Sequence, residues 1–127
     1  AQQGAEVIRV EPPGGAPDRE TMPIGVPGRG GMYLQMNGGK KSVTLDYSTP
    51  AGRAVLDALI RSSDVVVANL PRKALRALRL DYESLRALRE DIILTTISAF
   101  DFDGPEADKV GFDGTGQALS GATTLGA

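Results

Sequence analysis

The chain has 127 residues, a formal net charge of −2, 41% hydrophobic residues and 5% aromatic residues. This length suits one domain with an aliphatic core, and the near-neutral charge gives no support for nucleic acid or an anionic membrane as a partner. Histidine and cysteine are both absent, which excludes a Ser-His-Asp triad, a thiol nucleophile and a disulfide framework.

The first part of the chain combines one predicted strand with a long irregular segment. Val7, Ile8 and Val10 predict a buried strand. In residues 12–40, prolines and glycines are too frequent for regular structure to persist, so this segment is either a functional loop or a mobile surface loop. Within it, we expect residues 32–37 to form a short ordered island.

Regular structure is predicted from residue 41 onward. Residues 42–46 form a short strand, and Thr49 caps a helix that has Pro50 in its first position. One apolar stripe follows at helical spacing, made by Val55, Leu56, Leu59 and Ile60. Residues 64–70 carry three consecutive valines, as is typical of a strand buried on both faces of a parallel sheet.

Helices and strands continue to alternate to the end of the chain. We expect a helix from Pro71 to about residue 80, a helix capped by Asp81, a strand over residues 91–98, and a helix over residues 112–122. This order predicts an α/β fold, with an open parallel Rossmann-like sheet and flanking helices. We expect residues 1–127 to be part of a larger α/β domain, with the sheet incomplete at both ends.

The junction after the valine-rich strand is the strongest physical candidate for a binding site. Asn69 ends that strand and Pro71 begins the next helix, so unpaired backbone amides and the positive end of the helix dipole point out of the sheet edge. Positive charge follows at Arg72, Lys73, Arg76 and Arg79. These features favour a phosphate or pyrophosphate site, although a solvated basic helix face remains the alternative.

Other patterns are less favourable to a ligand. The carboxylates in residues 101–108 lack the alternating order of a calcium loop, so we interpret them as a solvated loop without a metal. Asp113 differs, because it lies between Gly111 and Gly114, where the backbone can approach a ligand closely. Neither a dinucleotide fingerprint nor a Walker loop is present, which disfavours NAD and ATP.

Several segments, taken in order, resemble the family III CoA-transferases, also called the carnitine-dehydratase-like or formyl-CoA-transferase-like family. They are residues 4–15 (GAEVIRVEPPGG), 40–46 (KKSVTLD), 49–53 (TPAGR), 64–70 (DVVVANL) with Leu75, and 104–105 (GP) with 111–113 (GFD) and 117–121 (QALSG). No single segment is specific, but their order is.

The resemblance implies an enzyme that moves CoA from an acyl-CoA donor to a carboxylic acid acceptor. In that family an aspartate attacks the donor thioester, and an aspartyl-CoA thioester follows. The resemblance also implies CoA as a substrate with no prosthetic group, and a homodimer. The absence of cysteine favours a reducing compartment, so we expect a cytoplasmic protein. It places the nucleophilic aspartate beyond Ala127, so no catalytic residue is expected within this chain.

CoA contacts are expected on two strand ends, the following basic helix, and the loop over residues 110–113. The expected CoA-binding residues are Leu45, Asp46, Asn69, Leu70, Pro71, Arg72, Lys73, Arg76 and Asp113. A basic position that the family has in this helix falls on Ala77 here, with Arg76 and Arg79 as substitutes. Another arginine that some members have after the first predicted strand falls on Pro12. By itself, the chain is expected to be inactive.

Two alternatives remain open. The related acyl-CoA racemases share the fold but use a histidine, and its expected position is Phe112 in a chain without histidine; the racemase then lacks its proton carrier. The second alternative is a noncatalytic fragment that binds CoA or a nucleotide, or that serves only as an interaction unit.

Overall fold

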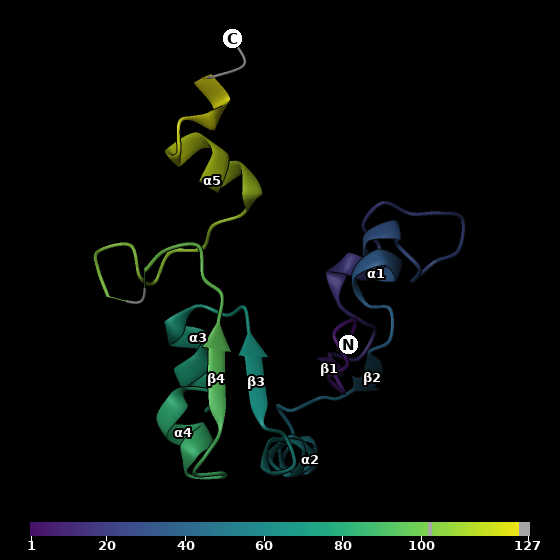
Figure 1. Ribbon diagram of the computed structural model, residues 1–127, viewed down its shortest axis with the longest axis vertical. Helices are drawn as coiled ribbons and strands as arrows, with labels where there is room; N and C mark the ends of the chain where they lie inside the picture. The colour runs from purple at the N-terminus through teal and green to yellow at the C-terminus, as the bar shows by residue number, and fades with distance from the viewer. Residues whose placement is uncertain (102, 125–127) are drawn as a thin grey trace. The chain divides into compact units, whose positions relative to one another are not determined.

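A computed structural model describes residues 1–101 and 103–124. The chain divides into two compact units, Ala1–Asp57 and Ala58–Ala127, and each is described by itself (Figure 1). Among the described residues, no helix is long and apolar enough to span a membrane.

The first unit is built on a parallel strand pair. Strand β1 (Ile8–Glu11) pairs with β2 (Lys41–Thr44), with Ile8 opposite Lys41 and Glu11 opposite Thr44. Parallel neighbours require a crossover connection, and the proline- and glycine-rich segment supplies it. That segment holds a short 3-10 helix, η1 (Pro17–Arg19), and helix α1 (Gly31–Met36). The expected ordered island is therefore helix α1, and the segment contains more regular structure than its composition predicts.

Helix α2 (Pro50–Arg61) starts as the sequence predicts. The Thr49 hydroxyl accepts a hydrogen bond of 3.1 Å from the Gly52 amide, which is the bond expected of a helix cap. Of the predicted apolar stripe, Leu56 and Ile60 are buried, whereas Val55 is 47% exposed. The stripe is thus narrower than predicted.

The second unit contains the other parallel pair. Strand β3 (Val65–Ala68) pairs with β4 (Ile93–Thr96), with Val65 opposite Ile93 and Ala68 opposite Thr96. Helices α3 (Arg72–Ala77) and α4 (Tyr82–Arg86) connect the strands, and Figure 1 shows both helices alongside β4. The buried hydrophobic residues of this unit are Ile60, Ala68, Leu75, Leu85, Ile92 and Ala107.

The valine-rich strand corrects one expectation. Val65 and Val67 are 47% and 65% exposed, so β3 is not buried on both faces in this structure. Exposure alternates along β4 as well, where Leu94 is partly buried and Ile93 is exposed. Leu94 lies on the face of β4 opposite to Ile93, and it lines a small cavity together with residues of α3 and α4. The two connecting helices therefore cover only this face of the strand pair.

The helix after Asn69 is shorter than predicted. Pro71 has an extended ψ of 149° and is the N-cap residue of α3, not its first helical residue. The helix therefore starts at Arg72 and has six residues. After the helix ends, Arg79 adopts a positive φ of 52°. The Leu80 amide then donates a hydrogen bond of 2.8 Å to the Leu75 carbonyl. This is the hydrogen-bond pattern of a Schellman motif, which terminates the helix before the predicted residue.

The remaining helices agree more closely with the sequence. Asp81 caps α4 by accepting from the Ser84 amide at 3.2 Å, as predicted. Helix α5 (Asp113–Leu119) is followed by a short 3-10 helix, η2 (Ala122–Thr124), because Gly121 adopts a φ of 76° between them. The predicted helix therefore ends about three residues early, and η2 begins where its predicted end lay.

The α/β class with parallel strands is confirmed in both units. The described residues contain two separate two-stranded sheets, so a single open Rossmann-like sheet remains a prediction.

Candidate functional site

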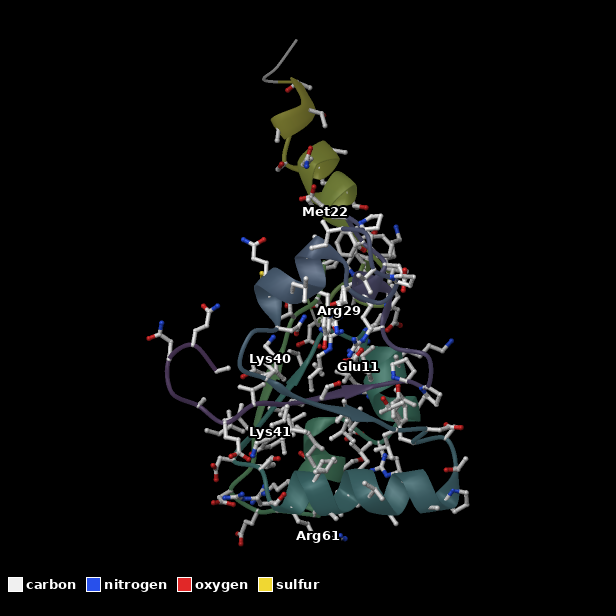
Figure 2. The ribbon with its side chains drawn as sticks, turned by 90° about the vertical axis from the view of Figure 1, so that its right-hand side faces the viewer. Glu11, Met22, Arg29, Lys40, Lys41 and Arg61 are labelled. Atoms are coloured by element: carbon white, nitrogen blue, oxygen red, sulfur yellow. The ribbon has the colours of Figure 1, made fainter. Side chains whose placement is uncertain are left out.

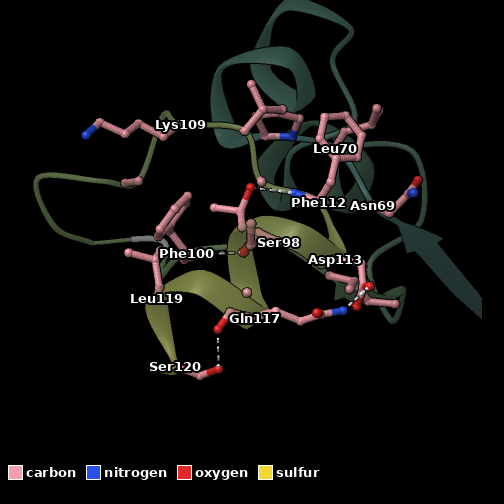
Figure 3. A pocket seen from close by; sticks show the side chains of 18 residues that line it. Asn69, Leu70, Ser98, Phe100, Lys109, Phe112, Asp113, Gln117, Leu119 and Ser120 are labelled. Atoms are coloured by element: carbon pink, nitrogen blue, oxygen red, sulfur yellow. Dashed lines mark hydrogen bonds between the residues drawn. The ribbon is translucent and has the colours of Figure 1, made fainter. Parts of the chain in front are cut away.

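A cavity of about 580 Å³ lies in the second unit, where strands β3 and β4 end (Figure 3). One wall is formed by residues 69–71, which follow β3, and another by residues 97–100, which follow β4. The rest is lined by the loop over residues 107–113 and by helix α5. The carboxyl ends of parallel strands are the usual place for a ligand in an α/β fold.

Close backbone packing shapes the cavity at Gly111. A β-carbon at this position would lie 2.6 Å from the β-carbon of Ala99, which is too short for a real contact. Only glycine lets the loop approach the extension of β4 so closely. On the same extension, the Ser98 hydroxyl donates to the Phe100 carbonyl at 2.6 Å.

The lining combines apolar surface with a few polar groups. Apolar side chains come from both strand ends, from the loop and from α5: Leu70, Pro71, Phe100, Val110, Phe112 and Leu119. The Asp113 carboxylate accepts a 2.6 Å hydrogen bond from the Gln117 amide. The Asn69 side chain, in contrast, has no hydrogen-bond partner among the described residues. This mixture suits an extended ligand with an apolar part and a few polar contacts.

The predicted site residues fall into separate groups. Asn69, Leu70, Pro71 and Asp113 line the cavity together. Arg72 and Arg76 line a second, smaller cavity of about 350 Å³ between α3, α4 and β4. Lys73 is exposed and lines neither.

The charge of Arg72 is partly engaged within the unit. Its guanidinium lies 3.5 Å from the Asp103 carboxylate and 4.0 Å from that of Asp108. These contacts are long and the carboxylates are exposed, so an incoming anion can compete with them. The shorter α3 also leaves fewer aligned peptide dipoles behind Pro71 than the sequence predicts.

Leu45 and Asp46 belong to the first unit. They follow β2, and the Leu45 amide donates to the Glu11 carbonyl at 2.8 Å. The Asp46 carboxylate accepts from the Ser48 hydroxyl at 2.6 Å and from the Ser48 amide at 3.0 Å. These hydrogen bonds lower the pKa of Asp46, because they favour the charged form. The contribution of both residues to CoA binding remains a prediction.

Several residues that line the cavity were not predicted from the sequence. Ser98, Phe100, Gln117 and Leu119 contribute to the cavity but were not nominated. Ser98 and Phe100 could have been found by the rule that selected Asn69, because they directly follow the next strand. Among the described residues, no group of three or more histidine, cysteine, aspartate or glutamate side chains is placed to hold a metal ion.

The whole chain is similar in sequence to CoA-transferases. The sequence profile of CoA-transferase family III matches residues 1–127. The chain is 41% identical to a succinate–glutarate CoA-transferase from Agrobacterium fabrum, over 98% of this chain and 33% of the relative. It is 39% identical to a succinyl-CoA–D-citramalate CoA-transferase from Chloroflexus aurantiacus, over 98% of this chain and 31% of the relative.

Solved structures give the same result. A CaiB/BaiF family protein from Brucella suis superposes with a TM-score of 0.84 at 37% identity, over 93% of this chain and 32% of that protein. The protein Rv3272 from Mycobacterium tuberculosis also gives a TM-score of 0.84, at 33% identity, over 95% of this chain and 33% of that protein. The chain thus spans about a third of the length of the relatives it matches. It belongs to CoA-transferase family III.

Proposed function

We propose that this chain supplies part of the CoA site of an enzyme that transfers CoA from an acyl-CoA donor to a carboxylic acid. The observation that carries this proposal is the cavity at the ends of β3 and β4 in a chain of this family, with Asn69 and Asp113 in its lining. A long apolar wall with sparse polar groups suits the pantetheine arm of CoA. The basic residues of α3, above all Arg76, supply charge for its phosphates.

The proposed chemistry uses a carboxylate nucleophile. An aspartate oxygen attacks the acyl carbon of the donor thioester, and the carbon–sulfur bond breaks. CoA leaves as a thiolate, and the aspartate and the donor's acyl group remain joined as a mixed anhydride. The thiolate then attacks the aspartyl carbonyl and releases the donor acid as a carboxylate. The acceptor carboxylate attacks the resulting aspartyl thioester, which expels CoA as a thiolate and forms a second mixed anhydride. The thiolate then attacks the acceptor's acyl carbon, which forms the new acyl-CoA and releases the aspartate as a carboxylate. No step needs a histidine or a prosthetic group.

In this proposal, the nucleophilic aspartate lies outside residues 1–127. The chain alone therefore binds CoA without turning it over, and catalysis requires the full-length protein, which we propose to be a cytoplasmic homodimer. Of the open alternatives, the racemase is disfavoured because Phe112 stands where its histidine is expected and the chain contains no histidine. Noncatalytic binding is an outcome that the test below can reveal.

Calorimetric titration of the chain with CoA tests the binding. The Asn69→Ala variant removes a cavity amide that has no partner among the described residues, and it should weaken binding several-fold, as expected for one lost hydrogen bond. Gln35→Ala is the matched control, because Gln35 is an exposed amide on α1, outside the cavity lining. Equal affinities for CoA in all three proteins would contradict the proposed site.

Activity is tested with the full-length enzyme. Incubation with succinyl-CoA and a panel of carboxylic acids should yield new CoA thioesters, which mass spectrometry detects. Racemisation of a 2-methylacyl-CoA without any transfer would support the racemase instead. Binding without either reaction would support a noncatalytic protein.

A further inference from the structure

Four charged side chains form a cluster in the first unit, which we call the charge quartet: Arg9, Glu11, Asp18 and Arg19 (Figure 2 labels Glu11). Arg19 donates to Glu11 from Nε at 2.6 Å and from Nη2 at 2.8 Å. Arg9 donates to Asp18 from Nη1 at 2.7 Å and from Nη2 at 2.6 Å. Its Nε also lies 3.3 Å from Glu11. The two cations and two anions cancel, and both main pairs have the bidentate geometry that makes such contacts strong.

Glu11 is the buried member of the quartet, with only 1% of its surface exposed. Besides Arg19, its carboxylate accepts from the Ala16 amide at 3.1 Å and from the Ser42 hydroxyl at 2.9 Å. One side chain thus joins β1 to β2 and to the start of the connecting segment. A buried carboxylate is stable only when its oxygens are satisfied in this way.

Arg19 carries the connection further into the segment. Its guanidinium lies 4.0 Å from the centre of the Tyr33 ring and donates to the Tyr33 hydroxyl at 2.8 Å, which ties helix α1 to the quartet. Its carbonyl accepts from the Gly30 amide at 2.6 Å. A β-carbon on Gly30 would lie 2.3 Å from the Thr21 carbonyl oxygen, so the two arms of the segment are in direct backbone contact.

We propose that the charge quartet is a clamp that fixes residues 12–40 in one conformation, and that the clamp depends on Glu11. The segment connects β1 to β2, and its composition alone favours a mobile loop. Three sets of contacts hold the segment in place: the charge quartet, the contacts of Arg19 with Tyr33, and the backbone packing at Gly30. The segment is therefore a permanent part of the fold and not a lid that opens and closes around a ligand.

Hydrogen exchange of the whole chain tests the clamp in the Glu11→Gln variant, which keeps the shape of the side chain and removes its charge. Protection of the Gly30 and Gly31 amides should fall on the order of a hundredfold, as expected when a buried ion pair loses one partner. Glu6→Gln is the matched control, because Glu6 pairs with Lys41 at 2.9 Å on the exposed surface of the same unit. Amides of the β3–β4 pair report whether the second unit stays folded.

A second variant, Arg19→Lys, keeps the charge but loses the forked geometry and the ring contact. Loss of protection confined to residues 12–40 in either variant, with β3–β4 unchanged, supports the clamp. The proposal is overturned if Glu11→Gln behaves like Glu6→Gln, or if both Glu11→Gln and Arg19→Lys unfold the whole chain. It is also overturned if the segment of the unaltered chain exchanges as fast as an unstructured peptide.

Discussion

Gly111 and Ala99 approach so closely that a β-carbon on Gly111 would stand 2.6 Å from the β-carbon of Ala99. The loop before α5 and the extension of β4 meet at this point, and both line the main cavity. The width of the cavity is therefore set by a residue that has no side chain.

Gly111→Ala should push these two walls apart and weaken CoA binding. Small-to-large changes at tightly packed positions cost about 1–3 kcal/mol, which corresponds to a loss of affinity of roughly 5-fold to 150-fold if the whole strain falls on the bound state. Gly114→Ala is the control, because a β-carbon at Gly114 would meet nothing within 4 Å. Titration calorimetry that finds the two variants equal to the unaltered chain would show that this contact does not shape the CoA site.

Arg76→Ala should lower CoA affinity through loss of charge. Arg76 lies on α3 and lines the smaller cavity, and its exposed guanidinium makes no hydrogen bond within the described residues. Its charge helps to lower the pKa of the Asp81 carboxyl, so a phosphate would have to compete only with this weak attraction. We expect a loss of several-fold at low salt that shrinks as ionic strength rises, because an exposed charge is screened.

Arg86→Ala is the control for this change, since Arg86 is an exposed arginine on α4 that lines neither cavity. An equal loss in both variants would indicate only a general effect of positive charge. Measurement of the dissociation constant at two salt concentrations separates these outcomes.

Glu11 should make the first unit sensitive to acid. Hydrogen bonds from Arg19, followed by those from Ala16 and Ser42, lower the pKa of Glu11 to about 2, against the opposing effect of burial. A carboxylate whose pKa is lower in the folded state stabilises the fold above its unfolded pKa, and this stabilisation is lost as the pH falls. The contribution is on the order of 3 kcal/mol at neutral pH, lost between about pH 5 and pH 2.

Chemical denaturation at several pH values measures this contribution. The Glu11→Gln variant should be less stable than the unaltered chain at neutral pH, and the difference should narrow toward pH 2. A difference that stays constant with pH would show that the ionised carboxylate is not the source of the stability.

Gly52→Ala should destabilise the start of α2. A β-carbon on Gly52 would lie 1.9 Å from the Asp46 carbonyl oxygen, so the helix cannot keep its position. We expect a loss above about 1 kcal/mol in the free energy of unfolding, although alanine is the better helix former. Gly116→Ala on α5 meets nothing within 4 Å and should instead stabilise by about 0.5–1 kcal/mol. Changes of the same sign in the two variants would contradict this account of Gly52.

Features controlled by neighbouring residues could be predicted from the sequence. Thr49 and Asp81 cap their helices as expected, because a cap depends on the residue and the next turn only. The parallel α/β class also followed from the alternation of strands and helices. Asn69 and Asp113 were predicted separately, and the structure places both in one cavity lining.

Features that depend on distant residues could not be predicted. The pairing of Glu11 with Arg19 joins a strand to an irregular segment, and no local pattern indicates it. The exposure of Val65 depends on which face the connecting helices cover, and three valines in a row do not reveal that. The early end of α3 is a local feature that also escaped prediction, because it requires a positive φ at Arg79, which is unusual for a residue with a side chain.

The most direct test of the proposed CoA site is an NMR titration of the isotope-labelled chain with CoA. The largest amide shift changes should occur at Asn69, at Leu70 and in the loop over residues 110–113, which line the cavity at the ends of β3 and β4. The exposed surface of α1 should show none. Unchanged spectra at millimolar CoA, or changes confined to residues away from the cavity, would contradict a CoA site at this position.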